Sequence, residues 1–157
     1  MSLTDRVLRG IRQLIARYYY SWGLSHRYVA NRFGLEWEYD RAARYFSKAI
    51  RWDPGYARAY LDRGILNWRE LDNPRQAVHD LTLAHTLNEN LTEARFNRGV
   101  AHQELGTYDR AIADFKAYLE VGEHPRWRGY AEAMIKELQP WVVDDESEET
   151  THTHHSA

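Results

Sequence analysis

The first element that the hydrophobic pattern predicts is an amphipathic helix over residues 3–22, with apolar and basic side chains on opposite faces. At about 100° per residue, its apolar side chains fall on one side of the helix. They are Leu3, Val7, Leu8, Ile11, Leu14, Ile15, Tyr18, Tyr19 and Trp22. The other side carries Arg6, Arg9, Arg12 and Arg17. Because Gly10 weakens a helix by about 1 kcal/mol relative to alanine, we expect this helix to depend on a docking surface.

From residue 23 onward, the apolar pattern repeats every 34 or 35 residues. Each period has a small residue, a second small residue further on, and a large apolar residue four positions after that one. These positions are Ala30, Gly64 and Gly99, then Ala42, Ala77 and Ala111, then Phe46, Leu81 and Phe115. Small residues facing large ones at fixed spacing are typical of closely stacked helices. The pattern therefore predicts three helical hairpins, at about 23–56, 57–91 and 92–125.

The stretch from Tyr39 and Asp40 through Ala42 and Phe46 to Pro54 resembles the second helix and terminal turn of the tetratricopeptide repeat family. Residues 108–112 repeat its beginning closely. The resemblance covers about residues 23–139 and implies an all-α, right-handed solenoid of helical hairpins that binds other proteins. One extra residue separates the two helices of the middle repeat, where Asn73 can cap the following helix and Pro74 suits its first position.

A final helix is predicted after Pro125, with Trp127, Ala131 and Leu138 on its apolar stripe. It resembles the capping helix that such an array needs at its end. The tail over residues 140–157 is acidic and rich in histidine, a composition that predicts disorder. The expected organisation is thus a basic helix at 1–22, three repeats with a capping helix at 23–139, and the tail.

The charge of the 157-residue chain is distributed unevenly although the net charge is only -2. Residues 1–32 contain six arginines and one aspartate, a net charge of +5, whereas residues 140–157 contain five acidic residues. The absence of cysteine excludes disulfides and thiolate zinc sites. No apolar run is long enough to span a bilayer, and the arginines of the first helix argue against a signal peptide. A cytoplasmic location is therefore the expectation.

The sequence offers no motif for catalysis, metal binding or a cofactor. Its eight histidines do not form a metal-binding pair flanking a carboxylate on one helix, and His79 beside Asp80 does not complete a triad. Three tail histidines, His152, His154 and His155, lie closer together, but ordering a flexible tail around an ion is unfavourable. We expect no enzyme, no small-molecule substrate and, because the basic patch is small, no nucleic-acid partner.

The better candidate for a site is a groove along the first helices of the repeats. In the family, a second stripe on these helices lines the concave face, so the resemblance implies an apolar channel with polar residues at its rim. The candidate groove residues are Arg27, Asn31, Arg58, Leu61, Asp62, Ile65, Trp68, Arg69, Phe96, Asn97 and Val100. An amphipathic helix or extended peptide would suit such a channel. The alternative is that the apolar members pack within the array itself.

Some family members bind the C-terminal carboxylate of chaperones with a set of basic and amide side chains. Arg27 and Asn31 occupy two places of that set. However, Asp62 stands where the family has asparagine, and Glu93 and Asn97 stand where it has basic residues. Because carboxylates repel a carboxylate ligand, this form of recognition is not expected.

The basic helix has three possible roles. It could cap the first repeat with its apolar stripe, lie on an anionic membrane surface, or dock on a larger membrane or cytoplasmic complex. The candidate docking residues are Arg6, Arg9, Ile11, Arg12, Leu14, Ile15, Tyr18, Tyr19 and Trp22. The sequence therefore predicts a non-enzymatic protein-interaction module that serves as an adaptor, assembly factor or accessory subunit by binding a protein or peptide segment. The alternative is a peripheral protein at the cytoplasmic face of a membrane, anchored by this helix.

Overall fold

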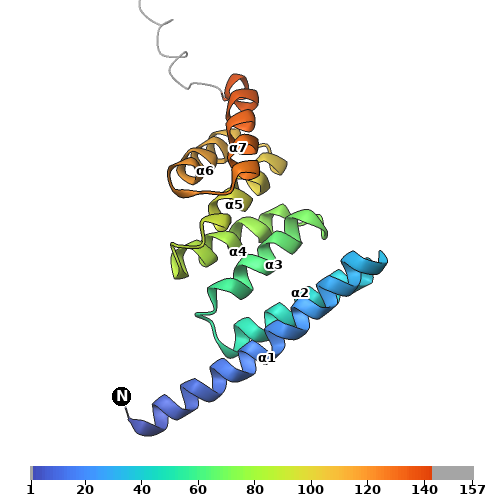
Figure 1. The fold of residues 1–157 in the computed structure, drawn as a ribbon, viewed down its shortest axis with the longest axis vertical. Coiled ribbons are helices and arrows are strands. Elements are labelled where there is room, and N and C mark those ends of the chain that lie inside the picture. Colours follow the sequence, from blue (N-terminus) through green and yellow to red (C-terminus); the bar gives the residue numbers. More distant parts are fainter. Residues whose placement is uncertain (1, 143–157) are drawn as a thin grey trace, which may run out of the picture.

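Seven α-helices follow one another in the computed structural model, which describes residues 2–142 (Figure 1). They are α1 (Leu3–Phe33), α2 (Trp37–Trp52), α3 (Ala57–Arg69), α4 (Pro74–Leu87), α5 (Thr92–Glu104), α6 (Tyr108–Val121) and α7 (Pro125–Leu138), followed by a short 3₁₀ turn, η1 (Gln139–Trp141). Helices α1, α3 and α5 each pair with the next helix, and the hairpins stack in chain order. No strand occurs in the described range. The prediction of an all-α solenoid of helical hairpins is confirmed.

The basic helix and the first helix of the first repeat form one continuous element, α1, rather than two. A capping box between Ser2 and Asp5 begins it, and Gly34 in a left-handed conformation (φ 67°) ends it. Gly23, at the predicted boundary, lies inside the helix and packs against Phe46. The buried residues of α1, Ala16, Gly23 and Ala30, are spaced seven apart and provide a strip of small side chains. Helix α2 lies along this strip, and the N-terminal part of α1 projects beyond it (Figure 1).

The hairpins are held at the predicted small and large positions. An added Cβ atom at Gly64 would lie 2.7 Å from Leu81 Cγ, and one at Gly99 would lie 2.7 Å from Phe115 Cε1. In the first hairpin, the ring of Phe46 lies against Gly23 instead, at 2.5 Å from such an atom. Real Cβ atoms do not approach other heavy atoms so closely, so any larger residue at these positions would force the facing side chain to shift.

In each of the second and third hairpins, a partly buried arginine paired with a buried aspartate also joins the two helices. Arg63 donates to both carboxylate oxygens of Asp80 at 2.8 and 2.7 Å, and Arg98 does the same to Asp114 at 2.8 and 2.6 Å. Each arginine also reaches a hydroxyl on the preceding hairpin. Because two-pronged, charge-assisted hydrogen bonds fix orientation, these pairs hold each hairpin and its neighbour in register.

Helix α7 covers the last hairpin with Ala131 and Leu138, which are both buried. Its Trp127 stacks on Phe96 of α5 with ring centroids 5.1 Å apart and planes 10° apart. The predicted cap on the third repeat is therefore present. Pro74 begins α4, with the side chain of Asn73 accepting a hydrogen bond from the Gln76 amide, as expected for the extra residue of the middle repeat. The tail from residue 143 lies outside the described residues.

Two glycine substitutions test this packing. A Gly99→Ala variant should lose about 1–3 kcal/mol of unfolding free energy, because its new methyl group overlaps the Phe115 ring in the core. The matched control is Gly10→Ala, at a helical site with no heavy atom within 4 Å of the new methyl. It should gain up to about 1 kcal/mol from helix propensity. Urea unfolding measures both, and equal midpoints for the two variants would contradict the proposed contact.

Candidate binding groove and exposed helix face

The first helices of the hairpins, together with α7, lie along one side of the stack and are joined by side-chain contacts. Arg27 of α1 pairs with Asp62 of α3 at 2.7 Å. The Trp68 indole of α3 donates to Asn97 of α5 at 3.3 Å. Phe96 of α5 stacks on Trp127 of α7. This side of the stack is the one on which the predicted groove residues lie.

The buried carboxylate of Asp62 organises the α1 end of the groove. It accepts hydrogen bonds from the hydroxyl of Tyr20 and from Arg27. Burial raises the pKa of Tyr20 above its ordinary value, and the neighbouring negative charge of Asp62 raises it further. Because Arg27 already has a carboxylate partner, its positive charge is largely compensated inside the protein.

The contact between α3 and α5 is also polar. Asn97, which is buried, accepts from Trp68 and donates to the Glu93 carbonyl at 2.7 Å. Near the other end of α3, Arg58 pairs with the Glu93 carboxylate at 3.4 Å. The groove floor is thus built from polar groups that are already paired.

The expected apolar channel needs correction, because three of its members belong to the core. Leu61, Phe96 and Val100 are 1%, 8% and 5% exposed and pack in the core clusters of the second and third hairpins. They lie next to the packing stripe on the same helices, so the stacked helices cover them. Only Ile65 and Trp68 remain half-buried, and both also pack against a core cluster.

A cavity of about 360 Å³ lies between α1 and α3. Its lining consists of Arg27, Asn31, Asp62, Ile65, Leu66, Arg69 and Glu70. Five of these were predicted groove residues, whereas Leu66 and Glu70 were not. Their spacing of four and eight residues from Asp62 places them on the same helix face, which is the signal that would have found them. Arg58, Trp68 and Asn97, which were also predicted groove residues, do not line this cavity.

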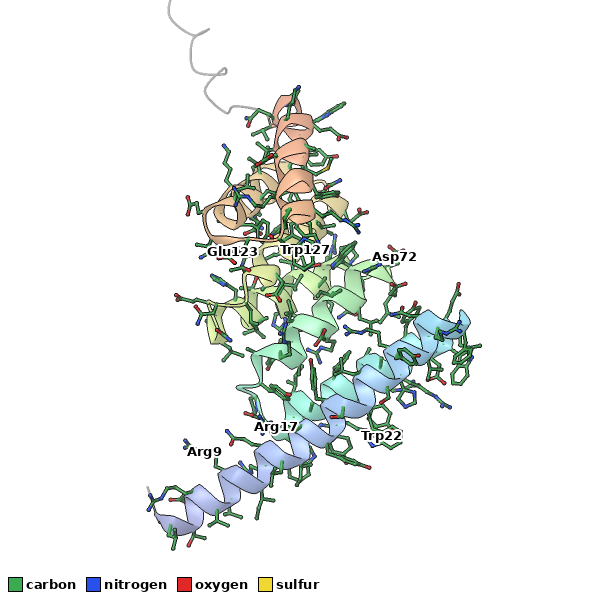
Figure 2. The ribbon with its side chains drawn as sticks, viewed as in Figure 1. Arg9, Arg17, Trp22, Asp72, Glu123 and Trp127 are labelled. Carbon is green, nitrogen blue, oxygen red and sulfur yellow. The ribbon has the colours of Figure 1, made fainter. Side chains whose placement is uncertain are left out.

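The apolar stripe in the N-terminal part of α1 faces solvent, so the prediction that it could cap the first repeat is wrong. Leu3, Val7, Ile11, Leu14 and Tyr18 are between 46% and 71% exposed. In Figure 2, Trp22 lies on the side of α1 away from the α3–α7 stack. The reason is that α2 packs on the opposite strip of small residues.

The remaining docking residues have different surroundings. Arg9 and Arg12 line a cavity of about 540 Å³ with Trp52 and Asp53 at the end of α2. Tyr19 packs on Tyr45, with ring centroids 6.3 Å apart, and Ile15 is half-buried. Arg6 is exposed and lies at the edge of the apolar stripe. The outer face of α1 is therefore the apolar surface that lacks cover, and the arginines lie beside and behind it.

Within residues 2–142, no group of three potential ligands is arranged to hold a metal ion. No helix in that range is long and apolar enough to cross a membrane. His102 is buried against Thr107, and burial lowers its pKa. The three tail histidines lie outside the described residues.

Comparison with known proteins identifies the architecture. Residues 92–121, which include α5 and α6, match the family model described as tetratricopeptide repeat. No curated protein matches the sequence. The structure is similar to the Arabidopsis OM64 TPR domain, with a TM-score of 0.70, 22% identity and coverage of 83% of this chain and 99% of that one.

Two further solved structures share the fold. The Sgt2 TPR domain from Aspergillus fumigatus gives a TM-score of 0.67 and 16% identity, with coverage of 85% of this chain and 91% of that one. The second TPR domain of human RPAP3, in complex with the HSP70 peptide SGPTIEEVD, gives a TM-score of 0.62 and 22% identity, with coverage of 77% of this chain and 98% of that one. The family match confirms the resemblance over residues 92–121, and the solved structures show the same fold over most of the chain.

Replacing Tyr20 tests the Asp62 site. A Tyr20→Phe variant should lose about 1.5–3 kcal/mol of unfolding free energy, as expected for a hydrogen bond to a charged acceptor. The folded pKa of Tyr20 lies above its ordinary value of 10.0, so the stability it contributes is present below pH 10 and is lost at higher pH. Urea titrations should therefore show the parent–variant difference shrinking as the pH rises above about 10. A difference that is absent at neutral pH, or that grows with alkalinity, would contradict this assignment.

Proposed function

We propose that this chain, a tetratricopeptide repeat protein, holds a segment of another protein in the groove between α1 and α3 and so serves as an adaptor, assembly factor or accessory subunit. The observation that carries the proposal is the cavity of about 360 Å³ in which Ile65 is surrounded by charged and amide side chains. The RPAP3 domain of the same fold is described in complex with a peptide, which supports a peptide-binding role for such a groove.

The groove residues favour a particular kind of segment. The half-buried Ile65 offers one apolar contact, and Asn31 and Arg69, which are exposed, offer hydrogen-bond donors above it. The Arg27–Asp62 pair is satisfied internally and supplies no uncompensated charge. We therefore expect the groove to bind a segment with one apolar anchor and polar backbone or side-chain groups around it.

The alternative function is a peripheral membrane protein, anchored by α1 at the cytoplasmic face of a membrane, with the array as a spacer. The exposed apolar face of α1 favours it. Removing residues 1–22 would not separate the two functions cleanly, because Ala16 and Tyr20 pack inside the first hairpin. Point substitutions in the groove and on α1 are the appropriate tests.

A pair of charge reversals tests the groove. Arg69→Glu changes a residue that lines the cavity, whereas Arg75→Glu makes the same charge change on α4, outside it. Both side chains are exposed, so both variants should fold like the parent. We expect co-purification and crosslinking from the native cell to recover a partner protein with the parent and with Arg75→Glu. The amount of that partner recovered with Arg69→Glu should be at least tenfold lower.

Retention of the same proteins by all three forms, with thermal unfolding unchanged, would contradict binding in this groove. Loss of the partner protein with both Arg69→Glu and Arg75→Glu would show that the net charge of the chain, and not the cavity, controls the interaction.

The groove is not expected to bind an acidic C-terminal peptide. The peptide SGPTIEEVD, bound by the RPAP3 domain, ends in several carboxylates. Here Asp62 compensates Arg27, and Glu93 adds a further negative charge beside the groove. We expect calorimetry to detect no binding of this peptide below about 1 mM, because like charges oppose the approach. Micromolar binding would contradict the proposed role of Asp62.

A further inference from the structure

We propose that the outer face of α1 docks the protein on an anionic lipid surface, using residues separate from those of the partner groove. The docking face consists of Leu3, Val7, Ile11, Leu14, Tyr18 and Trp22, with spacings of three or four residues along one side of the helix. This row spans about 28 Å at 1.5 Å per residue. It is therefore a continuous apolar strip that runs along most of α1.

Exposed large apolar side chains are concentrated in the N-terminal third of the described residues, where this strip lies. Its six side chains are between 44% and 71% exposed. Twelve of the 16 large hydrophobic side chains that are exposed in residues 2–142 lie between residues 3 and 52. Contiguous apolar surface of this kind marks an interaction site, whereas isolated exposed apolar side chains do not.

The positive charge around the strip favours an anionic surface as its binding partner. Residues 2–56 contain ten basic and five acidic side chains, whereas residues 57–142 contain 11 basic and 13 acidic ones. Arg6 and Arg17 border one edge of the strip by helical spacing. Arg12 lies on the α2 side of the helix, where it lines the cavity with Trp52 and Asp53. A helix with an apolar face bordered by arginines suits the boundary between acyl chains and anionic headgroups.

A second copy of the chain fits this face less well. Pairing two such strips would set the bordering arginines of the two copies side by side, and the like charges would repel. An anionic bilayer instead gains attraction from the same arginines. Tyr18 and Trp22, at one end of the strip, have the amphipathic rings that favour the headgroup region. Because no described helix could cross a membrane, the helix would lie on the surface.

Vesicle co-sedimentation of the full chain tests the proposal. The full chain should bind vesicles of equal parts phosphatidylcholine and phosphatidylglycerol, and not vesicles of phosphatidylcholine alone. Leu14→Asp, on the strip, should weaken binding by about tenfold or more. Leu87→Asp is the matched control, because Leu87 is 43% exposed on α4 and lies away from the strip. It should bind like the parent.

The charge contribution is measured with Arg6→Gln combined with Arg17→Gln. This variant should bind about tenfold more weakly, and about half-molar salt should weaken the parent similarly. Circular dichroism of each variant checks that α1 remains folded.

Two outcomes would overturn the proposal. The first is equal binding by Leu14→Asp and Leu87→Asp, which would remove the strip from the contact. The second is no vesicle binding by the parent together with a dimer that Leu14→Asp dissociates, which would assign the strip to a second copy. Neither outcome bears on the groove, since Arg69 lies outside the strip.

Discussion

Close approach of paired helices at small residues is the constraint on which the rest of this structure depends. Leu81 and Phe115 fit against glycine in the second and third hairpins, and Phe46 does so in the first. In the first hairpin the same requirement also sets the rotation of α1. Its strip of small residues must face α2, so the apolar strip on the other side of the helix is left facing outward. A packing rule thus determines which surface is free for interaction.

The groove follows from the stacking as well. Once the hairpins are in register, helices α1, α3 and α5 meet along one side, and their polar side chains satisfy one another. The Asp62 carboxylate replaces what a bound anion would otherwise supply to Arg27. Specificity in this groove therefore rests on the few groups that remain exposed beside Ile65. The chain combines the common solenoid architecture with a groove whose charges are largely compensated.

Much of the fold could be predicted from the sequence, because period and residue size report directly on helix stacking. Three features could not. The continuity of α1 could not be predicted, because the repeat period places a boundary at Gly23 and glycine is a weak helix former. In the structure, Gly23 instead provides the close contact with Phe46. The burial of Leu61 and the pairing of Asp62 with Arg27 depend on residues from different hairpins. Two neighbouring stripes of side chains on one helix become buried to different extents only when the hairpins stack. Sequence spacing alone therefore does not show which residues belong to the core and which line the groove.

The orientation of α1 is the central claim of this account, and thiol accessibility tests it most directly. The chain has no cysteine, so single cysteines at Leu14 and Ala16 can be labelled without interference. Leu14 is 65% exposed, whereas Ala16, two residues away, is fully buried. At low protein concentration, Leu14→Cys should react with a maleimide at nearly the rate of a free thiol, and Ala16→Cys should react at least tenfold more slowly. Equal rates, or protection of Leu14→Cys alone, would contradict the orientation.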